Sequence, residues 1–209
     1  MIKSDKKIFL IGSGGHAKNL IDTINENNQD IHGIISNKLE KNTKVYNIDV
    51  IGNDDDLFSF NCSEILLVNG IGFTPKSNAR NEFSKKMRKE GYRFLTVIDK
   101  NAMVSKNSTL MDGAQIMKGA IIQTNTQIGE NTIINTGSIV DHDCYIASDC
   151  HLCPGVVCNG NVTINKRSFV GSGSTIINNI TIGKDCSIAA GSIVYKDIAD
   201  NYELIQKRI

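Results

Sequence analysis

The chain has 209 residues, 22% of them charged, and a formal net charge of +1. This length allows one or two domains with a substantial core, and the balanced charge gives no electrostatic footprint for nucleic acid or a membrane surface. The first residues are basic and then apolar, but the apolar run is too short for a signal peptide or a membrane span. We therefore expect a cytoplasmic protein that binds neither nucleic acid nor membrane.

The first 97 residues show the alternation typical of a small α/β domain with a parallel sheet. Apolar runs predict strands, helical spacing predicts helices, and glycines follow the strands. The expected elements, in chain order, are a strand at 7–12, a helix through Leu20, Ile21 and Ile24, strands at 31–35 and 65–68, a helix at 75–90 and a strand at 94–98.

A glycine motif lies between the first strand and the first helix. Gly12, Gly14 and Ala17 match the G-x-G-x-x-G/A phosphate-binding fingerprint. However, Ser36-Asn37 stands where a dinucleotide site needs an acidic residue, and the domain is too short for two mononucleotide halves. A nucleotide-phosphate site at the helix N-terminus is one interpretation, and a tight turn without a ligand is the other.

The second part of the chain, 98–209, has a strict period of six. This period fits neither a helix face nor a single strand, and it predicts a parallel β-helix of triangular section with three hexads per coil. An aliphatic residue or Cys fills each interior position, and a small or β-branched residue follows four positions later at the corner. The interior series is Val104, Leu110, Ile116, Ile122, Ile128, Ile134, Val140, Ile146, Leu152, Cys158, Ile164, Val170, Ile176, Ile182, Ile188 and Val194.

The hexad register also assigns a structural position to four of the six cysteines. Cys144, Cys150 and Cys186 fall in the small corner position and Cys158 in the interior position, where a free Cys packs as a small hydrophobe. These positions do not converge on one point as a zinc site requires. We expect neither metal nor disulfides, and the register assigns no role to Cys62 and Cys153.

His142 follows the inward-facing Val140 by two residues and is flanked by Asp141 and Asp143. A carboxylate beside a histidine can fix its tautomer and stabilise its charged form. Acyl transfer from a thioester needs such a base near neutral pH, with backbone N–H groups for the oxyanion. The alternative is a solvated surface histidine between two acids.

Small residues lie on the coils that follow His142. Gly160 comes one coil of eighteen residues later at the same corner, where a side chain would crowd the histidine. The runs 171–173 and 189–191 are equally small and could leave room for an extended ligand that lies flat on the coils, although small residues are also common at tight corners. The residues expected to bind a ligand on this ground, which the resemblance described next identifies with the cofactor, are Gly160, Ser172, Gly173 and Ala190.

The chain resembles, along nearly its whole length, the family of sialic acid O-acetyltransferases and nucleotide-sugar N-acetyltransferases. The resemblance is carried by Gly-Ser-Gly-Gly-His-Ala at 12–17 and by the segments 135–144 and 151–162. It implies a left-handed β-helix, acetyl-CoA as co-substrate, His142 as general base, Asp143 as the residue that raises its basicity, and His151 near the thioester. It also implies nucleotide-sugar binding by Gly14, Gly15, His16 and Gly70, with Ser36 and Asn37 near the base or ribose.

Two departures from this family stand out. The bacillosamine-type members carry two acidic residues where this chain has Ser36-Asn37, which indicates a base other than uracil. The tail from Tyr202 onward lacks the family's common Gly-x-Pro-Ala-Lys ending.

From these observations we expect an acetyl-CoA-dependent N-acetyltransferase that acts on a nucleotide-linked 4-amino-4,6-dideoxy sugar for surface polysaccharide or glycan biosynthesis. The domain 1–97 would bind the nucleotide sugar, and the domain 98–209 would supply acetyl-CoA and the base. O-acetylation of a sialic-acid-like sugar is the alternative within this fold. A β-helix zinc enzyme of the carbonic-anhydrase type would need three His ligands. A scaffold without catalysis would leave the glycine motif and the Asp-His-Asp triplet at 141–143 unexplained.

His142 and His151 are nine residues apart, which is half a coil, and should therefore lie on different walls of the prism. If both serve one reaction, an adjacent subunit must bring its His151 toward His142, or CoA must bridge the two histidines across a groove between subunits. A homotrimer with sites at its subunit interfaces, the usual assembly of the family, meets this condition.

Overall fold

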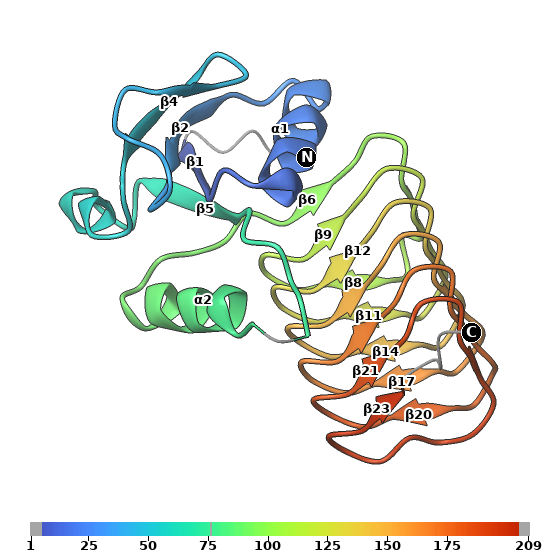
Figure 1. Ribbon diagram of the computed structural model, residues 1–209. Helices are drawn as coiled ribbons and strands as arrows, with labels where there is room; N and C mark the ends of the chain where they lie inside the picture. Colours follow the sequence, from blue (N-terminus) through green and yellow to red (C-terminus); the bar gives the residue numbers. More distant parts are fainter. Residues whose placement is uncertain (1–5, 76, 205–209) are drawn as a thin grey trace. The chain divides into compact units, whose positions relative to one another are not determined.

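A computed structural model describes residues 6–75 and 77–204. It divides into two compact units, Met1–Val97 and Ile98–Ile209 (Figure 1). The last five residues of the C-terminal tail, which departs from the family's ending, lie outside the described part of the chain. Among the described residues, no helix is both long and apolar enough to cross a membrane.

The first unit is built on a sheet whose described strands are ordered β3-β4-β2-β1-β5. Strands β4, β2, β1 and β5 pair in parallel, and β3 pairs antiparallel with β4. This confirms the predicted small α/β domain. The strands are β1 (Lys7–Ile11), β2 (Ile31–Ile35), β3 (Lys44–Val45), β4 (Ile48–Gly52) and β5 (Ile65–Asn69).

Helices α1 (Gly15–Glu26) and α2 (Ala79–Lys89) and a 3-10 turn, η1 (Asp56–Ser59), complete this unit. Side chains alternate between the two faces of a strand, and Phe9 and Ile11 of β1 share a core cluster with Phe83 and Met87 of α2. Helix α1 buries one apolar stripe at helical spacing, made of Ala17, Leu20, Ile21 and Ile24.

The structure corrects three expectations for this unit. The second helix begins at Ala79 and not at Pro75, because Thr74 and Ser77 form a bridge of their own. The strand expected at 94–98 is wrong: Phe94 makes a single bridge to Leu67, and only Val97–Ile98 forms a strand, β6. The pair β3–β4 was not predicted, because β3 has only two residues and Asp49 interrupts the apolar residues of β4.

Strands of two residues, three per coil, form the walls of a prism in the second unit (Figure 1). Strands pair in parallel at a spacing of eighteen residues, as Ile121 does with Ile139, except that Ser187 pairs with Glu203, sixteen residues later. The wall built on β13 contains β7 (Met103–Val104), β10 (Ile121–Ile122), β13 (Ile139–Val140), β16 (Val157–Cys158), β19 (Thr175–Ile176) and β22 (Ile193–Val194).

The two other walls have the same repeat. The wall built on β14 contains β8 (Thr109–Leu110), β11 (Gln127–Ile128), β14 (Tyr145–Ile146), β17 (Thr163–Ile164) and β20 (Thr181–Ile182). The wall built on β15 contains β6, β9 (Gln115–Ile116), β12 (Ile133–Ile134), β15 (His151–Leu152), β18 (Phe169–Val170), β21 (Ser187–Ile188) and β23 (Glu203–Leu204). The fold is the predicted left-handed parallel β-helix.

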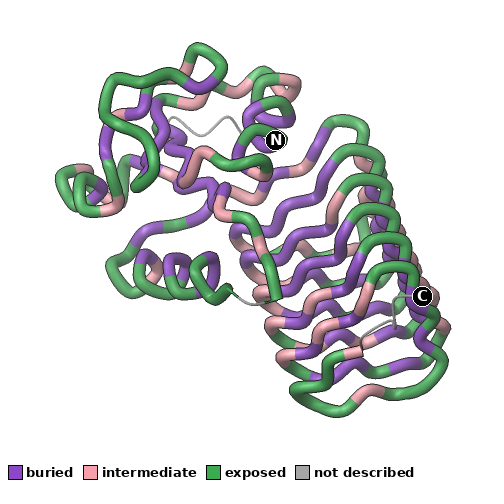
Figure 2. Tube along the Cα trace, in the orientation of Figure 1, coloured by how far each residue is buried: buried purple, intermediate pink, exposed green. Residues whose placement is uncertain are grey.

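The six-residue period has a simple packing basis. The interior residues from Ile116 to Val194 are buried in one continuous core, and exposed positions recur at the turns between walls (Figure 2). The corner hydroxyls do more than save space, because Thr132 and Ser138 donate hydrogen bonds of 2.7 and 2.9 Å to the carbonyls of Ala147 and Cys153 on the next coil. A larger residue at the corner would lose both the fit and this bond.

Cys144, Cys150, Cys158 and Cys186 are buried, as their positions in the register predict, and Cys153, which the register left without a role, is buried as well. Burial raises the pKa of the Cys144 thiol to about 11 and that of Cys150 to about 12. Thiols held this far from ionisation are inert packing groups. Cys62, which the register left without a role, packs half-buried against the core of the first unit.

Candidate active site

His142 lies in the turn that follows β13, where the chain leaves one wall of the prism. Val140 is buried in the core, and Asp143 adopts a left-handed conformation with φ 60°. Asp and Asn tolerate this region better than most residues, which explains why they recur at such turns. The turn holds the His142 side chain half-exposed on the surface of the β-helix.

The two acidic neighbours of His142 act on different parts of it. The Nδ1 atom of the ring lies 2.7 Å from Oδ2 of Asp143, whereas Oδ1 of Asp141 accepts the backbone N–H of His142 at 2.8 Å. Asp143 is itself held by Asn125 of the previous coil, whose amide donates to Oδ1 at 2.6 Å. Because a carboxylate only accepts, Nδ1 carries the proton and Nε2 is the basic nitrogen.

These contacts shift both pKa values in opposite directions. The hydrogen bond to Asp143, followed by the charge of Asp141, raises the pKa of His142 above its ordinary value. The hydrogen bonds from Asn125 and His142 lower the pKa of Asp143. The Asp143 carboxylate is therefore ionised at neutral pH, and it increases the basicity of the neighbouring His142 imidazole.

Gly160 lies against the His142 ring one coil later. A Cβ atom added at Gly160 would stand 2.5 Å from Cε1 and 2.6 Å from Nε2 of His142, closer than real Cβ atoms approach other atoms. The absence of a side chain at Gly160 therefore leaves the space that the His142 ring and its basic nitrogen occupy.

His151 lies on β15, in a different wall from β13, and its side chain is buried. Its Nε2 atom is 3.1 Å from the amide nitrogen of Asn135, and its ring meets that of Phe169 edge to face at 5.5 Å. Cys153 lies 3.9 Å from the same Nε2, and burial raises the pKa of its thiol to about 11. His151 is thus packed in its wall, in contrast to the exposed His142.

A hollow of about 310 Å³ lies on the outer face of the wall that contains β15. Of the residues expected to bind a cofactor, Ser172 and Ala190 line it, whereas His151, Gly160 and Gly173 do not. Gly171 and Ala189, from the small-residue runs 171–173 and 189–191, also line it, whereas the sequence did not indicate Cys153 or the tail residues Glu203 and Leu204. The tail therefore contributes to this hollow through β23.

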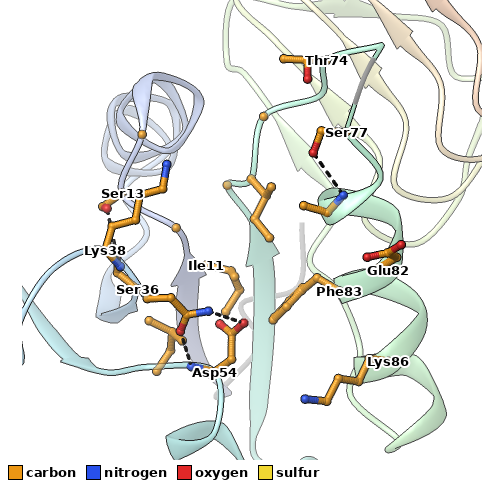
Figure 3. A pocket seen from close by; sticks show the side chains of 18 residues that line it. Ile11, Ser13, Ser36, Lys38, Asp54, Thr74, Ser77, Glu82, Phe83 and Lys86 are labelled. Carbon is orange, nitrogen blue, oxygen red and sulfur yellow. Dashed lines mark hydrogen bonds between the residues drawn. The ribbon is translucent and has the colours of Figure 1, made fainter.

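The first unit contains a pocket of about 680 Å³ between the ends of its parallel strands and α2. Of the residues expected at the nucleotide-sugar site, Gly14, Ser36, Asn37 and Gly70 line this pocket, and Gly15 and His16 do not. Parallel sheets bind ligands at the carboxyl ends of their strands. Figure 3 shows its labelled side chains, among them Ser13, Lys38, Asp54 and Phe83.

The glycine motif has the local geometry that anion binding requires. Gly12 has φ +88°, and its N–H donates to the carbonyl of Ile35 at 2.7 Å, which ties the turn to β2. Gly14 is the N-cap of α1 without a side-chain cap, and a Cβ atom there would meet nothing within 4 Å. The surroundings of Gly14 are thus open at the N-terminus of α1, where an anion is favoured.

Asp54, which the sequence did not indicate, also lines this pocket. It follows β4, and its carboxylate and backbone N–H both bond to the amide of Asn37, at 2.8 and 3.1 Å. The acidic residue missing from the end of β2 is thus supplied by the neighbouring strand. A local sequence pattern could not predict this contact between Asp54 and Asn37, because it depends on the pairing of β4 with β2.

Among the described residues, no group of three or more His, Cys, Asp or Glu side chains is arranged to hold a metal ion.

Comparisons with known proteins define the class. The PglD N-terminal domain family matches residues 7–87, and the bacterial transferase hexapeptide family matches residues 125–160. A search of curated proteins found no significant match. Among solved structures, a histidine-to-asparagine variant of perosamine N-acetyltransferase from Caulobacter crescentus, in complex with CoA and GDP-perosamine, is 30% identical with a TM-score of 0.87. The match covers 96% of this chain and 93% of that chain.

Two further structures extend this comparison. PerB from Caulobacter crescentus, in complex with CoA and GDP-perosamine, is 31% identical with a TM-score of 0.85, over 94% of this chain and 92% of that chain. The acetyltransferase domain of PglB from Neisseria gonorrhoeae, in complex with acetyl coenzyme A, shares the fold at 24% identity and a TM-score of 0.87, over 96% of each chain. The fold and these matches define a hexapeptide-repeat acetyltransferase. The chain belongs to the sugar acetyltransferase family that includes perosamine N-acetyltransferase, as its sequence predicts.

Proposed function

We propose that the protein transfers the acetyl group of acetyl-CoA to the amine of a nucleotide-linked 4-amino-4,6-dideoxy sugar for surface glycan biosynthesis. The observation that carries this proposal is the exposed His142, with Nδ1 bonded to Asp143 and Nε2 kept clear by Gly160. In this role the domain 1–97 binds the nucleotide sugar in the pocket beside α1, and the domain 98–209 binds acetyl-CoA. Complexes of family members with CoA and GDP-perosamine support both parts.

The chemistry follows from the position of the basic nitrogen. The amine nitrogen of the sugar attacks the thioester carbon, a C–N bond forms, and Nε2 of His142 takes the proton. The C–S bond then breaks, and the proton passes from the imidazolium to the CoA thiolate. Asp143 stabilises the imidazolium that forms between these two steps.

A thiol-release assay tests the substrate class. With acetyl-CoA as donor, GDP-, UDP- and dTDP-linked 4-amino sugars serve as acceptors, beside the free amino sugars and a free sialic acid. The proposal expects thiol release with a nucleotide-linked amino sugar and little with the free sugars. Faster turnover of the free sialic acid would favour O-acetylation instead.

Replacement of Asp143 by Asn tests the partner of the base. The variant loses the contact that raises the pKa of His142, so this pKa falls. Because only the neutral imidazole acts as base, activity is lost as the pH drops through this pKa. The acid limb of the kcat/KM profile should therefore move to lower pH, and the plateau should fall by roughly 10–100-fold, as for other orienting partners.

Asp149→Asn is the matched control for this variant. Asp149 stands at an equivalent turn with φ 60° and bonds to Asn131 at 2.7 Å, but it does not contact His142. Its pH profile should equal that of the unmodified protein. An unchanged acid limb in Asp143→Asn would remove Asp143 from the mechanism.

We further propose that the protein is a homotrimer with its sites at the subunit interfaces. The outward positions of the β13 wall are nearly all apolar, and Met103 and Ile193 at its ends are 60% and 69% exposed. The β14 wall instead presents polar side chains and one Tyr. A contiguous apolar face on a small protein favours association. The outward residues of the β13 wall are Met103, Ile121, Ile139, Val157, Thr175 and Ile193.

Ile139→Glu tests this assembly. A charge at the centre of the apolar wall should dissociate the oligomer, because an unpaired charge cannot be buried in an interface. The mass in solution, measured by light scattering, should fall to that of a monomer of 22.9 kDa. Gln127→Glu on the β14 wall should leave the mass unchanged. An intact oligomer of Ile139→Glu would show that this wall is not the interface.

A further inference from the structure

The pocket of the first unit contains a hydrogen-bonding pair of defined orientation, Asn37 and Asp54. The amide nitrogen of Asn37 donates to Oδ2 of Asp54 at 2.8 Å, and its amide oxygen accepts the backbone N–H of Asp54 at 3.1 Å. These two bonds fix which end of the amide is nitrogen, because the reverse orientation would set two donors and two acceptors against each other. The pair is thus a rigid recognition element that spans the ends of β2 and β4.

The pair offers carboxylate acceptors beside an amide donor. Oδ1 and Oδ2 of Asp54 both retain lone pairs, since a carboxylate offers about four acceptor sites, and the Asn37 amide, which donates one hydrogen to Oδ2, carries a second hydrogen. The residues line a pocket whose remaining surface includes Ile11, Ile71 and Phe83. Figure 3 shows the labelled side chains of Asp54 and Phe83 among those that line the pocket.

Guanine has the complementary order of groups on its Watson–Crick edge: the 2-amino group, N1–H and O6. A carboxylate can accept from the two adjacent donors in a bidentate manner, and an amide N–H can donate to O6. Uracil and thymine present one N–H between two carbonyls, which would place a carbonyl against the carboxylate. Adenine and cytosine each present an amino group beside an acceptor, so neither can satisfy both carboxylate oxygens.

We propose that this pocket selects a guanine nucleotide, that Asp54 reads the base, and that Asn37 orients Asp54 and contacts O6. This inference rests on the proposed function, which places a nucleotide sugar in the pocket. Phe83 and the aliphatic lining provide flat apolar surfaces for the base. Ser13 and Gly14 at the start of α1 lie at the phosphate end, and Lys38, which also lines the pocket, extends alongside Ser13 (Figure 3).

Calorimetric titration of the full chain with GDP, UDP, dTDP and ADP tests the inference without catalysis. GDP should bind at least about 10-fold more tightly than the other three, because a site with fixed acceptors penalises a base that lacks the donors. Asp54→Asn should weaken GDP binding by about 10–100-fold, the range for a lost charge-assisted bond. The amide oxygen of this variant can still accept from Asn37, so the pocket should keep its shape.

The control is Asp55→Asn, which removes the same charge one residue later at an exposed position outside the pocket lining. Its affinity for GDP should stay within about twofold of the unmodified protein, and Asp54→Asn should leave UDP binding equally unchanged. Tighter binding of UDP or dTDP than of GDP, or an unchanged GDP affinity in Asp54→Asn, would overturn guanine selection and leave the acetyltransferase proposal standing. Failure of all four nucleotides to bind would contradict both.

Discussion

Replacing His142 with Asn should lower kcat by about 10²–10⁴-fold, which is the loss expected when a positioned general base is removed. The side chain is half-exposed in a surface turn, so the substitution should not disturb the core of the β-helix. The expected measurement is the steady-state rate of thiol release, with the thermal unfolding midpoint and the affinity for acetyl-CoA unchanged. A residual rate within about threefold of the unmodified protein would end the assignment of His142 as the base.

Gly160→Ala should also reduce kcat, by about 10²-fold, because a displacement of about 1 Å at a reacting group has an effect of this size. The added Cβ atom would stand 2.5 Å from Cε1 of His142, so the imidazole must move. Gly160 has an ordinary backbone conformation, and the atoms in its way belong to an exposed side chain, so the coil itself should be retained.

A double variant separates this steric effect from a general disturbance. If Gly160 acts only through the histidine, Gly160→Ala combined with His142→Asn should be no slower than His142→Asn alone. If the reductions in kcat of the two single variants multiply in the double variant, Gly160 has a separate role, for example in the binding of CoA.

The β-helix could be predicted almost residue by residue, because its packing repeats. Each interior position from Val104 to Val194 meets the same confined space, so the same side-chain volume recurs every six residues. Strands β1 and β2 were equally visible as apolar runs. By contrast, only part of β4 is buried. Its pairing with β2 joins segments that are separated in the sequence, so no local pattern predicts it.

In the candidate sites, too, the sequence predicts what a repeat or a local pattern determines, and it does not predict contacts that depend on the tertiary structure. The sequence shows that His142 stands between two acids, but the turn geometry decides that Asp143 bonds to the ring and Asp141 to the backbone. The place of Asp54 beside Asn37 could not be predicted, because it follows from the pairing of β4 with β2. Residues joined by the coil repeat, such as Gly160 and His142, are predictable because eighteen residues return the chain to the same corner.

The central claim is the transfer of an acetyl group to an amine of a nucleotide-linked sugar. Its most direct test is the chemical linkage formed when acetyl-CoA labelled in the acetyl group is incubated with a GDP-linked 4-amino-4,6-dideoxy sugar. The product should be an amide, so the label should remain on the purified sugar nucleotide after treatment with alkaline hydroxylamine, which cleaves oxygen esters. Release of the label as acetyl hydroxamate would reveal an ester, and the absence of labelled sugar nucleotide would contradict the account as a whole.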